Sequence, residues 1–128
     1  MLYQGIAYAQ NTLALQEKCT EGAKKFFYDR GFKFVVEKGD NGTQFNNYQC
    51  HYTKKLDKCF ILITSFSYRK SDGKEEPFHY EALCDAFEGK IYGEISGLVG
   101  GSITGTVMGK FCKSQDEFEA LIKPYMEE

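Results

Sequence analysis

The chain has 128 residues, 42% hydrophobic and 16% aromatic, with 11 Phe and 9 Tyr but no Trp. That length suits one domain with one core, and so many large rings exclude a chain that remains disordered. The formal net charge of −2 gives the chain no overall attraction for nucleic acid or anionic lipid, so we expect no nucleic-acid partner.

The first residues resemble the end of a secretory leader. An Ala-x-Ala pattern ends at Ala9, as at a cleavage site, although the residues before it are too few and uncharged for a whole signal peptide. We predict a tail or signal-peptide remnant over residues 1–11 and a single α+β domain over residues 12–128. No later stretch approaches the ~20 apolar residues of a membrane span, so none is expected.

A helix is predicted over residues 12–30. Apolar side chains recur there with the 3.6-residue period that places them on one helix face. Gly31 follows at the position where a glycine in the left-handed conformation often ends a helix. The residues of the apolar face are Leu15, Cys19, Ala23, Phe26 and Phe27.

The middle of the chain predicts an antiparallel meander. Strands are expected over residues 32–37, 44–53, 59–68 and 78–87. Their connections are expected to be an Asn41-Gly42 turn, a polar tip at 54–57, a charged loop at 69–77 and a tight turn at Glu88-Gly89. Residues 59–64 are almost continuously apolar, which is typical of a central strand covered on both faces.

Glycine recurs every fourth residue, at Gly93, Gly97, Gly101, Gly105 and Gly109. On a helix this spacing would line one side with bare backbone, as in membrane helices that pack closely. We favour a β-hairpin, because each glycine destabilises a helix by ~1 kcal/mol. A Gly-Gly pair in the middle of the segment also suits a tight turn.

The last helix is predicted to begin after Ser114, because Ser114 and Glu117 form a capping box. Pro124 is expected to fray or kink its final turn. The predicted fold class is therefore α+β: an N-terminal helix packed on an antiparallel β-meander of about five to six strands, with a C-terminal helix. We expect both helices to close over the same face of the sheet. The apolar face of the last helix comprises Phe118, Leu121, Ile122 and Tyr125.

Basic residues concentrate between residues 50 and 74, where six Lys or Arg against two Asp give a balance of +4. We favour a solvated surface as the interpretation of this excess, and the alternative is a basic hairpin tip that meets an acidic partner. The candidate ligand- or partner-binding residues around the tip are His51, Lys54, Lys55 and Lys58.

Asp85 and Glu88 are candidate site residues as well, because carboxylates at a strand end can act as acid and base. Carboxylates three residues apart at a turn are more often ordinary turn chemistry, which is the favoured interpretation. The two histidines, His51 and His79, lack metal-ligand spacing, so we expect no metal site and no cofactor. Cys50 and His51 are adjacent in a strand and point to opposite faces, so they do not form a nucleophile–base pair with each other.

Five cysteines are many for this length, and none lies in a C-x-x-C motif. Their wide spacing favours one or two disulfides and hence an oxidising compartment, although free cysteines also serve as small buried hydrophobes. The odd count leaves at least one thiol unpaired. The five are Cys19, Cys50, Cys59, Cys84 and Cys112.

The run from His51 to Ile63 resembles an uncharacterised family of small secreted bacterial proteins with a His-Tyr-x-Lys-Lys-Leu-x-Lys-Cys hairpin. The similarity continues in Glu17-Lys18-Cys19, in the Asp-Ala-Phe-Glu-Gly-Lys motif at 85–90 and in residues 116–128, and it departs at residues 93–109. The resemblance implies a secreted or periplasmic protein, with Cys19, Cys59 and Cys112 as possible disulfide cysteines. It implies no activity.

The leading hypothesis is an exported, noncatalytic domain that binds a protein or a small ligand through the sheet face or the basic tip. One alternative is an enzyme of unknown reaction with a site near His51, Asp85 and Glu88. Another is a membrane-associated glycine-zipper protein built on residues 93–109. A cytoplasmic location is the alternative to a secreted or periplasmic one.

Overall fold

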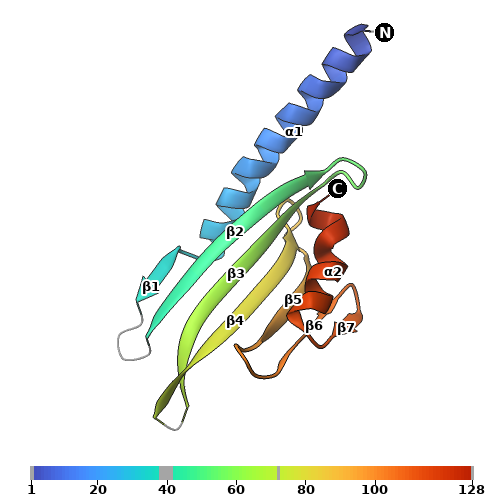
Figure 1. Cartoon of the computed structure of the whole chain (residues 1–128). Coiled ribbons are helices and arrows are strands. Elements are labelled where there is room, and N and C mark those ends of the chain that lie inside the picture. Colours follow the sequence, from blue (N-terminus) through green and yellow to red (C-terminus); the bar gives the residue numbers. More distant parts are fainter. Residues whose placement is uncertain (1, 38–41, 72, 128) are drawn as a thin grey trace.

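The computed structural model describes residues 2–37, 42–71 and 73–127, and it describes the backbone alone at residues 2–11 and 69–71. Helix α1 (Leu2–Asp29) precedes an antiparallel sheet whose strands follow chain order, and helix α2 (Gln115–Met126) follows the sheet (Figure 1). The α+β prediction is confirmed. Within the described residues the seven strands are β1 (Val35–Glu37), β2 (Thr43–Thr53), β3 (Lys58–Ser71), β4 (Lys74–Asp85), β5 (Ile91–Leu98), β6 (Ile103–Val107) and β7 (Lys110–Cys112).

Several element boundaries differ from the predicted ones. Helix α1 begins at Leu2 rather than at residue 12, so the backbone of the predicted tail is helical from residue 2 on. The first strand is shorter than predicted, and the short strand β7 was not predicted. The predicted Asn41-Gly42 turn falls partly outside the described residues, and Gly42 has a φ of +88°.

The charged loop predicted over residues 69–77 is wrong, because β3 and β4 both extend into this segment and form one long hairpin. The register places Arg69 opposite Glu76 and Lys70 opposite Glu75. Opposite charges on paired strands stabilise a hairpin, so a charged segment can still be a strand.

Strand β3 is apolar on both of its faces. Cys59, Ile61 and Ile63 point toward α1, whereas Phe60 and Leu62 point toward α2. Because side chains alternate along a strand, each face needs its own cover. The two helices therefore lie on opposite faces of the sheet, and the prediction that both cover one face is wrong.

Helix α1 packs through its C-terminal half. Ala23 and Phe27 are fully buried in a cluster with Ile61 and Ile63, and the ring centroid of Phe27 lies 4.8 Å from that of Tyr48. Full burial of one such phenylalanine contributes roughly 1.5–3 kcal/mol. The N-terminal part of α1 extends beyond the sheet (Figure 1).

Helix α2 covers the other face with Phe118 and Ile122, and the ring centroid of Tyr125 lies 5.3 Å from that of Phe60. The predicted start of α2 is confirmed.

The cap of α2 is confirmed in part: Ser114 Oγ accepts a hydrogen bond from the Glu117 amide at 3.1 Å, whereas Glu117 Oε2 accepts from the Lys113 amide at 2.8 Å and not from that of Ser114. Pro124 does not end α2, which continues to Met126.

The glycine-rich segment forms the predicted hairpin of β5 and β6. A Cβ atom on Gly97 would lie 2.2 Å from the carbonyl oxygen of Ser102, and one on Gly105 would lie 2.0 Å from that of Glu94. These glycines therefore permit close approach of two strand backbones, and the alternative of a glycine-lined helix is wrong. No helix in the described part of the chain has both the length and the apolar character required to span a bilayer.

Cys19 on α1 and Cys59 on β3 form a fully buried disulfide. It joins residues 40 positions apart, and the constraint on the unfolded chain stabilises the fold by roughly 4 kcal/mol. Cys50, Cys84 and Cys112 are free thiols. Cys112 does not form the disulfide that the resemblance implies, because it lies on the α2 face and the other four cysteines lie on the α1 face.

Candidate functional site

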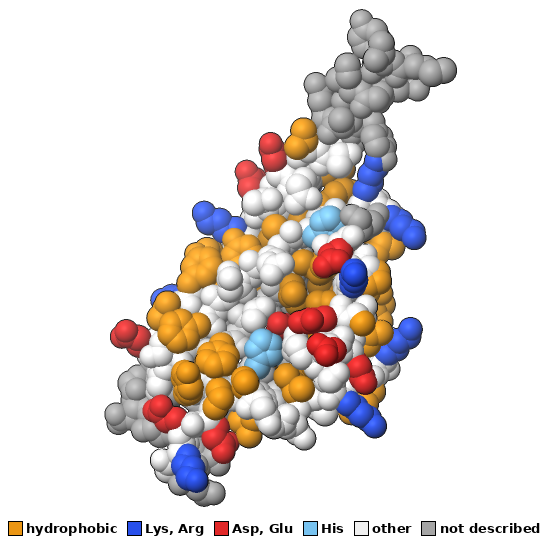
Figure 2. Space-filling model, viewed as in Figure 1, with side chains coloured by type: hydrophobic (Ala, Val, Ile, Leu, Met, Phe, Trp, Pro, Cys, Tyr) orange, Lys and Arg blue, Asp and Glu red, His pale blue; other side chains and the backbone are white. Residues whose placement is uncertain are grey.

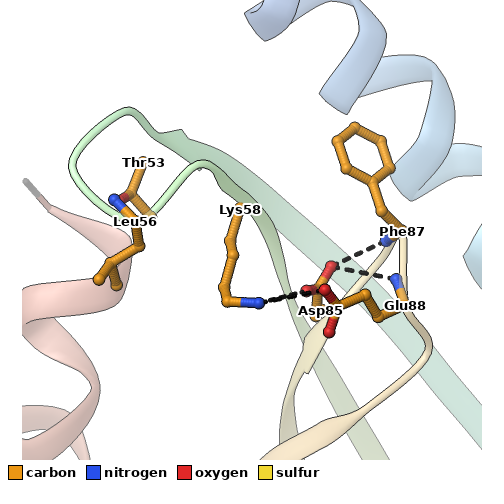
Figure 3. Close-up of polar contacts among 6 residues, drawn as sticks. All are labelled: Thr53, Leu56, Lys58, Asp85, Phe87 and Glu88. Carbon is orange, nitrogen blue, oxygen red and sulfur yellow. Dashed lines mark hydrogen bonds and ion pairs between the residues drawn. The ribbon is translucent and has the colours of Figure 1, made fainter.

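Three of the predicted site residues come together at one end of the sheet (Figure 3). Lys58 Nζ lies 3.4 Å from Asp85 Oδ2 and 3.3 Å from Glu88 Oε1. Its interaction with the Tyr92 hydroxyl, followed by that with Glu88, raises the pKa of Lys58 above its usual range, while burial acts in the opposite direction. Lys58 is therefore a charged counterion for two carboxylates.

Asp85 organises the turn that follows β4. Its side chain is 1% exposed, and Oδ1 accepts hydrogen bonds from the backbone amides of Phe87 at 2.9 Å and Glu88 at 3.3 Å. Phe87 points toward α1, where its ring packs against Gly22 (Figure 3). Oδ1 of Asp85 thus holds the turn and Oδ2 pairs with Lys58 on β3, so both oxygens have a structural role.

His51 lies outside this cluster. Phe60 is its partner in register on β3, and Asp85 is the partner of Phe60 on β4. Two strand spacings, roughly 10 Å, therefore separate His51 from Asp85. The Nε2 atom of His51 is buried and has no hydrogen-bond partner among the described residues.

Lys54 and Lys55 are exposed in the turn between β2 and β3. Thr53 Oγ1 accepts a hydrogen bond from the Leu56 amide at 3.1 Å, which fixes this turn (Figure 3). The predicted basic tip is smaller than its sequence range, because residues 69–71 and Lys74 lie at the other end of the β3–β4 hairpin, after roughly 40 Å of strand. The basic charge between residues 50 and 74 is thus divided between two hairpin ends.

A second group of polar side chains lies on the α2 face, where β4 passes the first turn of α2. An open pocket of about 370 Å³ lies there, beside the turn that joins β5 and β6. Its polar lining comprises His79, Glu81, Gln115 and Glu119. Its apolar lining comprises Leu98, Val99 and Ile103.

Glu81 is the centre of this pocket and is 9% exposed. Its Oε2 accepts a hydrogen bond from Gln115 Nε2 at 3.0 Å, and its Oε1 lies 3.2 Å from His79 Nε2 without hydrogen-bond geometry. Gln115 Nε2 also donates to Glu119 Oε1 at 3.3 Å. His79 Nε2 and Gln115 Oε1 are both buried without a hydrogen-bond partner in the part of the chain that the structure describes.

Sequence reasoning considered His79 only as a metal ligand, rejected that role, and missed this pocket. Strand alternation places His79 and Glu81 on one face, and helical spacing places Gln115 and Glu119 one turn apart. Those two patterns are visible in the sequence. The sequence does not show that the first turn of α2 lies over this part of β4.

Apolar side chains border the pocket on its other side. Val35, Phe45, Phe66 and His79 form one row in register across β1 to β4, and Val35 and Phe45 are 53% and 49% exposed. Figure 2 shows hydrophobic side chains gathered over this part of the molecule, with a histidine and acidic side chains beside them. We define the open face as Val35, Phe45, Phe66, Tyr68, Pro77 and His79.

The comparisons with known proteins add no family. A scan of protein-family models, a search of curated proteins and a search of solved structures each found no match to this chain. Across the described residues, no group of three or more His, Cys, Asp or Glu side chains is arranged to hold a metal ion. The function is therefore argued from the side chains themselves.

Asp85→Ala should lower the free energy of unfolding by about 3 kcal/mol, because it leaves two backbone amides and the Lys58 ammonium without their buried partner. Glu88→Gln is the matched control, and it should change stability by less than about 0.5 kcal/mol, because Glu88 is exposed. Urea denaturation measures both. Wild-type stability in Asp85→Ala would contradict the structural role of Asp85.

Stability should also depend on the Cys84 thiol at alkaline pH. Burial is the main cause that raises the pKa of Cys84 from 9.0 to about 11, aided by Glu94 and opposed by Arg30. The folded state therefore favours the neutral thiol. This contribution, roughly 2–3 kcal/mol, is present below pH 9 and is lost as the pH rises toward 11.

Thermal unfolding of the wild type and Cys84→Ala between pH 8 and pH 10.5 tests this expectation. The melting temperature of the wild type should fall more steeply than that of the variant. Equal slopes would show that the thiol does not remain neutral in the fold.

Proposed function

We propose that this protein is a noncatalytic binding module that takes its partner on the open face of the sheet. One observation carries the proposal: exposed aromatic side chains lie next to a pocket of buried polar groups. Phe45 and Tyr68 are 49% and 40% exposed, and the ring centroids of Phe66 and Tyr68 lie 5.4 Å apart. Contiguous apolar surface with a polar border is typical of interaction sites.

The open face is favoured over the basic tip because of how the charges are used. Lys58 is paired within the protein with Asp85 and Glu88, so little of its charge is offered to a partner. The open face instead lies on the paired strands β1 to β4, whose backbone hydrogen bonds fix the spacing of its side chains. Rigid aromatic groups bind a partner with a small loss of conformational entropy.

The enzyme alternative lacks a supporting contact. It requires His51, Asp85 and Glu88 to act together, whereas the carboxylate of Asp85 is engaged by Lys58 and by two backbone amides. His51 lies two strands from Asp85. A binding role requires none of these groups to be reactive.

We further propose that the protein is exported by a bacterium and works in the periplasm or outside the cell. The buried disulfide between α1 and β3 supports this location, because disulfides persist where thiols are oxidised. The resemblance of residues 51–63 to small secreted bacterial proteins agrees with it.

Export predicts the number of thiols. Protein purified from its native organism without reductant and then denatured should react with iodoacetamide at three cysteines, because Cys19 and Cys59 are joined. Mass spectrometry should find five modified cysteines after reduction. Five modified cysteines before reduction would contradict an oxidising compartment.

Site-specific photocrosslinking in the native organism tests the binding surface. Benzoylphenylalanine placed at Phe45 or at Tyr68 should capture one and the same partner. The matched control is Thr104, which is exposed and lies on the opposite face of the sheet. Capture from Thr104 with equal yield would contradict the assignment of the open face.

Affinity for the captured partner gives a second readout. Phe45→Ser should weaken binding at least tenfold, which is about 1.4 kcal/mol and within the range of an aromatic interface residue. Phe111→Ser is the control, because Phe111 is 61% exposed and pairs with Thr106 on the other face. Unchanged affinity in Phe45→Ser would overturn the proposal.

A further inference from the structure

We infer that the pocket formed by His79, Glu81, Gln115 and Glu119 receives an arginine side chain of the binding partner. The inference rests on the proposed function, because His79 belongs both to the pocket and to the open face. The partner presents there a positive charge with several N–H donors on an apolar stem.

The first argument is the charge on Glu81. A carboxylate that is nine-tenths buried is costly unless a cation and hydrogen bonds compensate for its lost hydration. Its partners within the protein are the neutral amide of Gln115 and the His79 ring, whose Nε2 lies 3.2 Å from Oε1 and is a cation only in its protonated form. The described lining of the pocket includes no Lys or Arg, so the carboxylate lacks a permanent cation until a ligand supplies one.

The pocket also contains hydrogen-bond acceptors that lack donors. Gln115 Oε1 is a buried acceptor without a partner in the described residues, and the carboxylate of Glu119 accepts only the 3.3 Å bond from Gln115 within the pocket. The carboxylate of Glu81 adds further acceptor capacity. A guanidinium presents five N–H donors in one plane and no acceptor, so it matches this set, whereas an anion would be repelled.

Part of the pocket lining is apolar. Leu98, Val99 and Ile103 line the pocket beside the carboxylates, and they suit the methylene stem of an arginine. The Val99 amide donates a hydrogen bond to the Pro77 carbonyl at 2.9 Å, and this bond fixes the rim before any ligand enters. A pocket of about 370 Å³ accommodates one long side chain.

The N-terminus of α2 lies at this pocket and acts against a cation, but its effect is small. A helix N-terminus is worth about 0.3–1 kcal/mol toward a nearby charge. Here the first turn carries Asp116 and Glu117, and the Ser114 side chain accepts from the Glu117 amide. These groups offset the positive end of the helix.

Two labelled, acetylated hexapeptides test the inference, one with a single central arginine and one with citrulline, which has nearly the same shape without the charge. Fluorescence anisotropy measures affinity, and the ring resonances of His79 and His51 report the location. The arginine peptide should shift the His79 resonances and leave those of His51 unchanged. It should bind at least tenfold more tightly than the citrulline peptide.

Glu81→Gln should reduce affinity for the arginine peptide at least tenfold, and Glu119→Gln on the exposed helix surface should reduce it at least threefold. If Glu81→Gln does not fold, the affinity of Glu119→Gln tests the inference in its place. Glu94→Gln is the control, since this carboxylate contacts the Tyr80 hydroxyl, and affinity should stay within twofold.

Equal affinity for the two peptides, or unshifted His79 resonances, would overturn the inference. A partner that crosslinks at Phe45 and binds Glu81→Gln and Glu119→Gln as tightly as wild type would overturn it too, while the proposed function would stand.

Discussion

The structure depends on the two-sided burial of strand β3. Alternate side chains of this strand are apolar on both faces, and Phe60, Ile61 and Ile63 are each at most 2% exposed. A strand of this kind is stable only if each face is covered, since either exposed row would cost several kcal/mol of lost burial. The placement of the helices on opposite faces follows from this one constraint.

The open face and its pocket follow from the lengths of the covering elements. Helix α2 has 12 residues and is about 18 Å long, whereas β3 has 14 residues and is about 46 Å long. One short helix therefore covers only part of its face. The part of the face that α2 leaves uncovered is the open face. At the boundary between the covered and uncovered parts, Gln115 and Glu119 lie next to Glu81.

The cysteines lie on both faces of the sheet. The Cys19–Cys59 disulfide holds α1 to the sheet, and Cys112 is buried beneath α2 on the other side. The sheet thus separates a crosslinked layer from one held by packing alone. A partner on the open face would lie on the α2 side of the sheet. Among the described residues, no disulfide joins α2 to the sheet on that side.

Local patterns predicted most of the fold. The Ser114 cap, the apolar face of α1 and the hairpin over residues 91–109 each depend on a few neighbouring residues, and each is confirmed. One error concerns elements far apart in sequence. The almost continuous apolar run at residues 59–64 was interpreted as a strand covered on both faces, but its consequence for the placement of α2 was missed.

The candidate site shows the same limit. Lys58 was identified from the basic tip, and Asp85 and Glu88 from a strand end; the structure brings the three together, although Asp85 holds the turn. The pocket around Glu81 was missed because 34 residues separate Glu81 from Gln115. Nothing local in either segment specifies that contact.

The most direct test is a nuclear Overhauser spectrum of the aromatic side chains. Opposite-face packing predicts cross-peaks between Phe27 and Tyr48 and between Phe60 and Tyr125, whose ring centroids lie 4.8 Å and 5.3 Å apart. It predicts no cross-peak between Phe27 and Tyr125. A Phe27–Tyr125 cross-peak would place both helices on one face and contradict the account.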